Sequence, residues 1–110
     1  DAFGKINGIE FQPELKNSFG NRWLTTILVD PERTGTDKEK IRLELNKYNI
    51  ESRPLWKPMH LQPVFKGCDN YVNKTCEKMF DRGLCLPSDT KMTDAQIDEI
   101  ISIMAGLLKV

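Results

Sequence analysis

The sequence has 110 residues, of which 39% are hydrophobic, so it is long enough for one domain with a single core and too apolar for a disordered chain. Lysine plus arginine and aspartate plus glutamate each number 16, and the lack of a basic excess argues against a nucleic-acid partner. No apolar run is long enough to cross a bilayer and the first residues lack the zones of a signal peptide, so we expect no membrane association.

The first twenty residues are predicted to lead into the domain from a larger preceding part, and residues 21–110 are predicted to be the domain itself. The sequence lacks an initiator methionine, and residues 1–6 have the character of the end of a helix, with Gly8 as its stop. Pro13 and Gly20 then predict a loop over residues 11–20, with room for one edge strand.

Residues 23–29 form the clearest predicted strand, because they are rich in β-branched and aromatic residues. Both faces of this segment are largely apolar, which is typical of a central strand covered on two sides. Thr36 and Glu39 then have the spacing of a capping box. This spacing predicts a helix over residues 37–48, with Asn49 as a left-handed stop.

The second half of the chain is predicted to alternate between strand, loop and helix. Residues 50–56 look extended, and Pro54 confines them to an edge of the sheet or to a bulge. Residues 57–67 are predicted to be loop, residues 73–81 a short helix and residues 84–86 a strand.

The last predicted helix begins with a second capping box, formed by Thr93 and Gln96. The elements together predict an α/β fold of the α+β two-layer kind, in which helices cover a short sheet. The apolar positions of the last helix recur at helical spacing and are predicted to pack in the core: Ile97, Ile100, Ile101, Met104, Leu107 and Leu108.

The three cysteines, Cys68, Cys76 and Cys85, do not fit a closed disulfide framework because their number is odd. This usage favours an intracellular, cytoplasmic protein. No pair has the C-x-x-C spacing of zinc knuckles, so free thiols are favoured over a zinc site that these cysteines would share with His60.

The stretch RPLWKPMHLQP, residues 53–63, concentrates the chemically useful side chains of the sequence. Arg53, Lys57 and His60 together suit an anionic ligand such as a phosphate or a carboxylate, and Trp56 offers a flat apolar wall. The prolines reduce the entropic cost of holding these groups in place. The alternative is that the apolar side chains belong to the core and the charged ends are solvated. Outside this stretch the sequence has no catalytic motif and no second histidine.

The same stretch strongly resembles a signature of the DegT/DnrJ/EryC1/StrS aminotransferases. Three further segments resemble the family in the same order, namely residues 21–23 (NRW), 83–88 (GLCLPS) and 92–97 (MTDAQI). The resemblance covers nearly the whole chain. It implies the small C-terminal domain of a fold-type I enzyme that depends on pyridoxal phosphate and aminates keto sugars attached to nucleotides.

The resemblance also implies a division of labour. The upstream large domain would carry the Schiff-base lysine, the acid that pairs with the pyridinium nitrogen and most of the phosphate cup. Pyridoxal phosphate is therefore expected in the intact enzyme, whereas this chain alone is expected to bind no cofactor and to be inactive. The implied partners are a nucleotide-sugar substrate, an amino-acid donor such as glutamate, the large domain and a second copy in a homodimer. The implied role is the synthesis of surface polysaccharides or glycans.

By the same resemblance, the proline-rich stretch would face the substrate. His60 is expected to hydrogen-bond the substrate, while Arg53 and Lys57 contact anionic groups. Trp56 would form a wall, and Gln62 completes the expected substrate-binding set.

Some subfamilies place a His-Tyr pair where this chain has Pro54 and Leu55, so their contacts are not carried over. Two alternatives stay open. One is a stand-alone module that binds an anion through residues 53–62. The other is a sugar dehydratase or a regulatory relative of the same fold that depends on the same cofactor.

Overall fold

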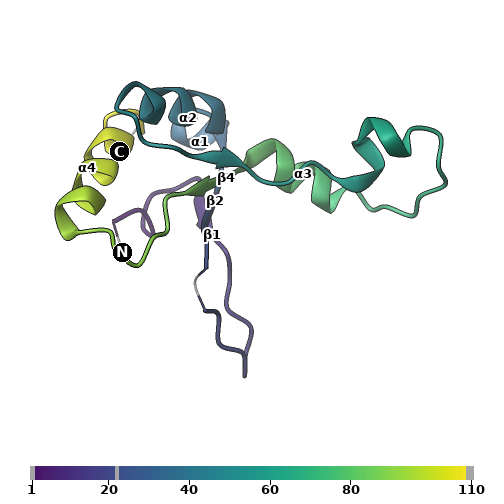
Figure 1. Cartoon of the computed structure of the whole chain (residues 1–110), viewed down its shortest axis with the longest axis horizontal. Coiled ribbons are helices and arrows are strands. Elements are labelled where there is room, and N and C mark those ends of the chain that lie inside the picture. The colour runs from purple at the N-terminus through teal and green to yellow at the C-terminus, as the bar shows by residue number, and fades with distance from the viewer. Residues whose placement is uncertain (1, 22, 109–110) are drawn as a thin grey trace.

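The computed structural model describes residues 2–21 and 23–108, which form a four-stranded antiparallel sheet with helices packed against it (Figure 1). Asp1, at the predicted helix end, and Arg22, in the predicted lead to the first strand, lie outside the described residues. In chain order the elements are β1 (Ile9–Phe11), β2 (Thr25–Val29), α1 (Pro31–Thr34), α2 (Lys38–Lys47), β3 (Arg53–Pro54), the 3₁₀ helices η1 (Met59–Leu61) and η2 (Pro63–Phe65), α3 (Thr75–Arg82), β4 (Gly83–Leu86) and α4 (Asp94–Ala105).

The strands are ordered β1-β2-β4-β3, and every neighbouring pair is antiparallel. The prediction that the segment containing β2 is a central strand is confirmed, because β2 pairs with β1 on one side and β4 on the other. Pro54 lies in the edge strand β3, as predicted, where its missing N–H costs no ladder hydrogen bond. The predicted α/β class, with a short sheet covered by helices, is confirmed.

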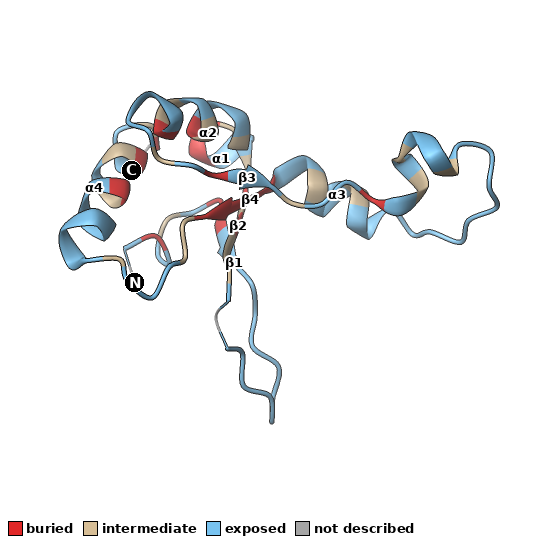
Figure 2. Ribbon diagram, viewed as in Figure 1, coloured by how far each residue is buried: buried red, intermediate tan, exposed pale blue. Residues whose placement is uncertain are grey.

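The core lies between one face of the sheet and the helices α2 and α4, where the buried positions of Figure 2 gather. Ile27 pairs with Leu84 across the two central strands, and both side chains are fully buried. Ile41 of α2 and Met104 of α4 are also fully buried in the same cluster. Burial of such side chains contributes about 1.5–3 kcal/mol each, so this layer is the main source of stability.

The helix α2 begins one residue later than predicted. The residue that caps it is Asp37, whose carboxylate accepts a hydrogen bond from the backbone N–H of Lys40 at 2.9 Å. The predicted capping box of Thr36 and Glu39 is therefore wrong, since Thr36 is buried and Glu39 is bonded to Arg42 instead. A carboxylate at the cap also interacts favourably with the helix dipole, which a hydroxyl does not match. The predicted left-handed stop at Asn49 is confirmed by its φ of 59°.

The capping box of α4 is present as predicted. The hydroxyl of Thr93 accepts from the backbone N–H of Gln96, and the Gln96 side chain accepts from the Thr93 N–H in return. The predicted apolar stripe is correct at Ile100 and Met104, which are buried. It is wrong at Ile97, which is 41% exposed.

The start of the chain differs from its prediction. Described residues 2–8 form turns rather than the end of a helix, and β1 begins at Ile9, before the predicted loop. Gly8 has a φ of +96°, and a Cβ at this position would lie 2.7 Å from the Cβ of Arg33. Glycine is required here for the close approach of α1, a short helix that the sequence reasoning missed.

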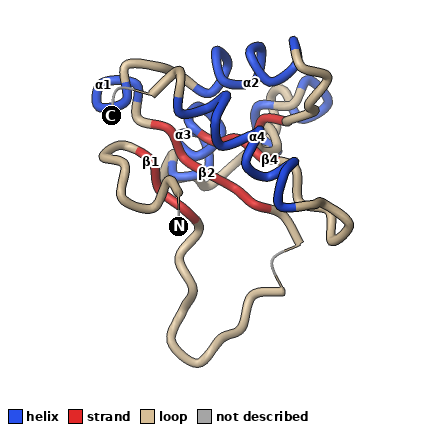
Figure 3. Tube along the Cα trace, turned by 90° about the vertical axis from the view of Figure 1, so that its left-hand side faces the viewer, coloured by secondary structure: helices blue, strands red, loops and turns tan. Residues whose placement is uncertain are grey.

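Two segments project from this body. One is the loop that joins β1 to β2, most of which is exposed and extends away from the helices (Figure 3). The other, residues 55–82, is hereafter called the arm and contains η1, η2 and α3 (Figure 1). The Cα radius of gyration is 15.4 Å, whereas about 13 Å is expected for a compact domain of this length, and the two projections account for the difference.

Candidate functional site

The arm carries four of the five predicted site residues, and the fifth lies where the arm leaves the sheet. Arg53 belongs to the edge strand β3, and the chain then passes through Trp56 and Lys57 into η1. Both of these side chains are exposed. The alternative in which Trp56 is a core residue is therefore wrong for the described part of the chain.

His60 lies in η1 and makes a partly buried polar contact with α3. Its Nε2 is 2.9 Å from the Oε1 of Glu77, which comes from α3. The side chain of His60 is 13% exposed and that of Glu77 is 29% exposed. The sequence reasoning missed Glu77, because the intervening residues 61–76 carry no periodic signal that pairs η1 with α3.

Arg53 pairs with a residue that precedes β3, not with a residue of the arm. Its guanidinium donates to the Oε1 of Glu51 at 2.7 Å and 2.9 Å. Both side chains are about three-quarters exposed, at 75% and 74%, so the pair adds little stability. The structure therefore separates Arg53 from His60, and leaves its charge partly neutralised at the surface.

Gln62 closes the turn that carries the exposed side chain of Lys57. Its side-chain amide donates to the backbone carbonyl of Lys57 at 3.2 Å and contacts the sulfur of Met59 at 3.5 Å. In this arrangement Gln62 fixes the shape of the loop between Lys57 and η1. Lys57 keeps an exposed side chain that an anionic group can reach.

The helix α3 connects the arm to the body through two cationic side chains. Lys38, at the start of α2, donates from Nζ to the backbone carbonyl of Phe80, and its Nζ lies 4.4 Å from the centroid of the Phe80 ring. Partial burial lowers the pKa of Lys38, and the nearby Asp81 opposes that shift. Arg82 reaches Asp30 at 3.5 Å. Lys38 is therefore partly buried by this contact and not fully solvated.

The base of the arm is tightly packed at Gly83, the first residue of β4. A Cβ at this position would lie 2.5 Å from the carbonyl oxygen of Met79 and 2.1 Å from the side chain of Leu55. Leu55 also donates its backbone N–H to the carbonyl of Gly83 at 3.3 Å. The absence of a side chain at Gly83 lets the outgoing and returning limbs of the arm meet at the sheet.

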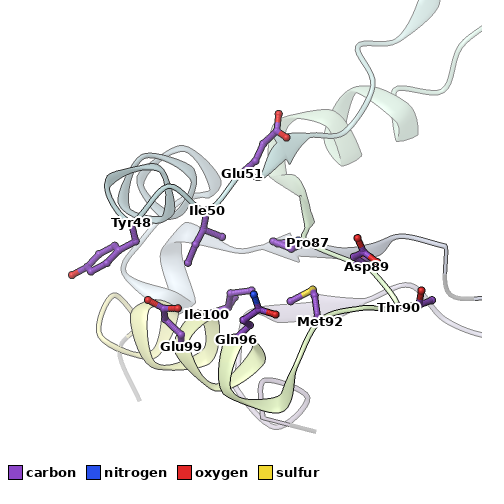
Figure 4. A pocket seen from close by; sticks show the side chains of 11 residues that line it. Tyr48, Ile50, Glu51, Pro87, Asp89, Thr90, Met92, Gln96, Glu99 and Ile100 are labelled. Atoms are coloured by element: carbon purple, nitrogen blue, oxygen red, sulfur yellow. The ribbon is translucent and has the colours of Figure 1, made fainter.

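An open groove of about 770 Å³ lies elsewhere, between the end of α2, the segment after β4 and α4 (Figure 4). Its floor is apolar, with Ile50, Met92 and Ile100, and its rim carries carboxylates such as Glu99. None of the five predicted site residues lines this groove. The groove and the proline-rich stretch are therefore separate features of the surface.

The cysteines are free thiols in the structure, with Cys68 and Cys76 exposed on the arm and Cys85 buried in β4. Burial raises the pKa of the Cys85 thiol, which keeps it protonated and unreactive. Within residues 2–21 and 23–108, no three histidine, cysteine or acidic side chains are grouped so that they could hold a metal ion. In the same part of the chain, no helix is long and apolar enough to cross a membrane.

The sequence profile of the DegT/DnrJ/EryC1/StrS aminotransferase family matches residues 1–105. The chain belongs to this family. Its resemblance, first seen in residues 53–63, is thereby confirmed over nearly the whole sequence. The family is one of aminotransferases.

Two curated relatives illustrate the match. EpsN of Bacillus subtilis, which is named as a pyridoxal phosphate-dependent aminotransferase, is 39% identical over 111 residues, covering 97% of this chain and 28% of EpsN. GDP-perosamine synthase of Caulobacter vibrioides is 30% identical over 86 residues, covering 78% of this chain and 23% of the synthase. The chain thus spans about a quarter of the length of these relatives.

Solved structures support the fold. The aminotransferase TlmJ from Streptoalloteichus hindustanus superposes with a TM-score of 0.79 at 18% identity, over 96% of this chain and 28% of TlmJ. DesI, solved in the presence of its TDP-sugar product, superposes with a TM-score of 0.77 at 18% identity, over 94% of this chain and 26% of DesI. The family members therefore share this fold as one part of a longer chain.

The described residues do not fit pyridoxal phosphate by themselves. Lys38 has a pKa that is lowered by burial, but its Nζ donates to the carbonyl of Phe80 and it does not line the groove beside α4. Arg53 is paired with Glu51 at the surface and the side chain of Lys57 is exposed, so neither cation forms an enclosed site for a phosphate.

Proposed function

We propose that this chain is the substrate-side, C-terminal small domain of a pyridoxal-phosphate-dependent aminotransferase that transfers an amino group from an amino acid to a nucleotide-linked keto sugar. The observation that carries the proposal is the family match over residues 1–105. The relatives that are named for sugar chemistry, such as GDP-perosamine synthase, support the class of substrate. Glutamate is the donor that we propose, and surface polysaccharide or glycan synthesis in the cytoplasm is the setting.

The cofactor and its Schiff-base lysine belong, in this proposal, to a larger domain that precedes residues 21–110, with residues 1–20 leading in from it. The share of the relatives that this chain covers supports that division. The chain alone is then inactive, because the group that supplies the electron sink would be held elsewhere. The intact enzyme is proposed to be a homodimer.

The arm and the β1–β2 loop provide the surface on which such a larger body would pack. Most of the large apolar side chains that are exposed in the described residues lie on these two projections rather than around the core. Exposed apolar side chains that gather in this way are typical of surfaces that are covered in an assembly. On the β1–β2 loop and its flanks they are Phe11, Leu15, Phe19 and Trp23, and on the arm they are Trp56, Met59, Leu61, Val64, Tyr71, Val72 and Met79.

Within this function, the proline-rich stretch is proposed to contact the sugar substrate. His60 would hydrogen-bond a polar group of the sugar, and Lys57, whose side chain is exposed, would contact an anionic group such as the diphosphate. Trp56 offers an exposed ring as a wall for the substrate. Arg53 and Gln62 complete the proposed substrate-binding set, Gln62 by fixing the Lys57 backbone.

The replacement His60→Ala in the intact enzyme tests this assignment. We expect the half-reaction with the keto sugar to lose about tenfold in kcat/KM, the size of one lost hydrogen bond, while the half-reaction with the amino donor is retained. The two half-reactions are followed separately by the visible spectrum of the bound cofactor in single-turnover experiments. Lys47→Ala, at the far end of α2, is the matched control. Equal losses in both half-reactions would contradict the role of His60, and a protein that forms no cofactor band would contradict the aminotransferase itself.

A further inference from the structure

The contact between His60 and Glu77 determines which nitrogen of the imidazole faces outward. An ionised carboxylate has only acceptor oxygens, so the nitrogen that lies 2.9 Å from Glu77 must be the one that carries the hydrogen. In the neutral form of the ring, this contact selects the Nε2–H tautomer. The Nδ1 atom is then left with a lone pair and with no hydrogen-bond partner among the described residues.

Two observations indicate that Nδ1 is the atom offered to a ligand. First, Nδ1 is not fully buried. Within the described chain, the polar side-chain atoms that are fully buried and lack a partner are the hydroxyls of Thr36 and Ser52. The imidazole is also 13% exposed, so the ring is enclosed at Glu77 and still reachable from outside. A ring nitrogen with a lone pair is an acceptor for a hydroxyl donor.

Glu77 is itself held in place by the element that carries it. The helix α3 is docked on the body by Lys38, which bonds to the carbonyl of Phe80, and by Arg82, which pairs with Asp30. The hydrogen bond between His60 and Glu77 joins η1, in the part of the arm that leaves the sheet, to α3, in the part that returns to it. The position of the imidazole therefore follows the position of α3 rather than that of the exposed loop.

We infer that Glu77 is a positioning residue that acts through His60, holding its ring so that Nδ1 accepts a hydrogen bond from a hydroxyl of the sugar substrate. The inference rests on the proposed function, because it takes His60 to contact that substrate. It assigns Glu77 no contact with the substrate or the cofactor. It also specifies the chemistry of the contact, which is a hydroxyl donor rather than an anion.

The kinetic test is a double-mutant cycle between Glu77 and His60 in the intact enzyme. We expect Glu77→Ala to raise KM for the keto sugar about tenfold with a smaller change in kcat, and to have no further effect when His60 is already Ala. Glu77→Gln keeps an acceptor oxygen but also offers an N–H donor, so we expect an intermediate effect. Lys78→Ala, the exposed neighbour on α3, is the control. Additive effects of Glu77→Ala and His60→Ala would overturn the inference, because they would show that Glu77 does not act through the imidazole.

The tautomer itself is a readout that does not depend on activity. In the intact enzyme labelled with ¹⁵N-histidine, the His60 signals are identified by their loss in His60→Ala. We expect a protonated Nε2 in the wild type and a mixture of tautomers in Glu77→Ala. An unchanged tautomer would overturn the inference and leave the proposed function standing. A His60→Ala enzyme with wild-type kinetics for the sugar would overturn both the role of His60 and, with it, that of Glu77.

Discussion

At the scale of single residues, a few positions decide how the elements begin. Short side chains cap two helices, and one glycine lets two parts of the backbone come close together. Asp37 caps α2 and Thr93 caps α4, each through a hydrogen bond to a backbone N–H of the first turn. Gly83 admits the two limbs of the arm to the sheet, because any side chain there would meet the carbonyl of Met79. These positions act locally, so their effects on stability are predicted from one contact each.

The cap at Asp37 predicts a dependence of stability on pH. The backbone N–H of Lys40 lowers the pKa of Asp37 below its ordinary value of 3.8, with partial burial opposing that shift. A carboxyl whose folded pKa is lowered stabilises the fold above its unfolded pKa, and this contribution is lost as the pH falls through the folded pKa. Asp37→Asn cannot titrate, so we expect its difference from the wild type in free energy of unfolding to shrink as the pH falls from about 6 to about 2.

Urea denaturation of the 110-residue chain at a series of pH values measures this difference. Asp37→Ala removes the capping oxygen as well as the charge, and we expect it to cost about 1 kcal/mol at neutral pH. A difference between wild type and Asp37→Asn that stays constant over the whole acid range would contradict the prediction.

At the scale of elements, α3 links the arm to the domain body. One face of this helix holds Glu77 against His60, while Phe80 lies against Lys38 of α2. Lys38 gives up part of its hydration in this position, which is why its pKa is lowered, and the Phe80 carbonyl and ring replace the lost water. Docking of α3 is therefore expected to depend in part on Lys38, alongside the pair of Arg82 and Asp30.

The replacement Lys38→Met tests the docking of α3, because it keeps the length of the side chain and removes the charge and the hydrogen bonds. We expect backbone amides in α3 to exchange with solvent about tenfold faster, while amides in α4 keep their wild-type rates. Hydrogen exchange followed by mass spectrometry resolves the two helices. Lys47→Met, at the other end of α2, serves as the control, and α3 rates that match the wild type in Lys38→Met would contradict the prediction.

At the scale of the whole molecule, a compact body is joined to two projections whose apolar side chains are exposed. The body holds the continuous core of the sheet, α2 and α4, whereas the arm and the β1–β2 loop contribute few buried residues. Segments with few buried contacts open at low free-energy cost unless another surface covers them. The proposed larger domain and second subunit would supply that surface.

Limited digestion with trypsin compares the covered and uncovered states. In the 110-residue chain we expect cleavage after Lys66 and Lys74, in the arm, before cleavage after Lys40 and Lys47, in α2. In the intact enzyme we expect the arm sites to be cleaved at least about tenfold more slowly, because the arm is then packed against other surfaces. Arm sites that are cut equally fast in both proteins would argue against the proposed packing.

Much of the fold followed from the sequence because its signals are local. The apolar, β-branched run of β2, the proline of β3 and the reciprocal pair Thr93 and Gln96 each report on their own backbone within a few residues. The misplaced cap of α2 shows the limit of such signals, since Thr36 and Asp37 are both acceptable caps and only packing selects between them. Burial of Thr36 in the core leaves Asp37 to begin the helix.

The sequence by itself determined the family and the order of β2, α2, β3, α3, β4 and α4, and it predicted a stretch of candidate substrate contacts. Only the tertiary structure decided which of these side chains meet. Arg53 pairs with Glu51 on the surface, whereas His60 is hydrogen-bonded to Glu77, which lies on a helix that returns to the sheet after a long loop. The physical reason is that such a contact depends on how the limbs of the arm are docked, by Lys38 and by the close approach at Gly83, and no local preference encodes that geometry.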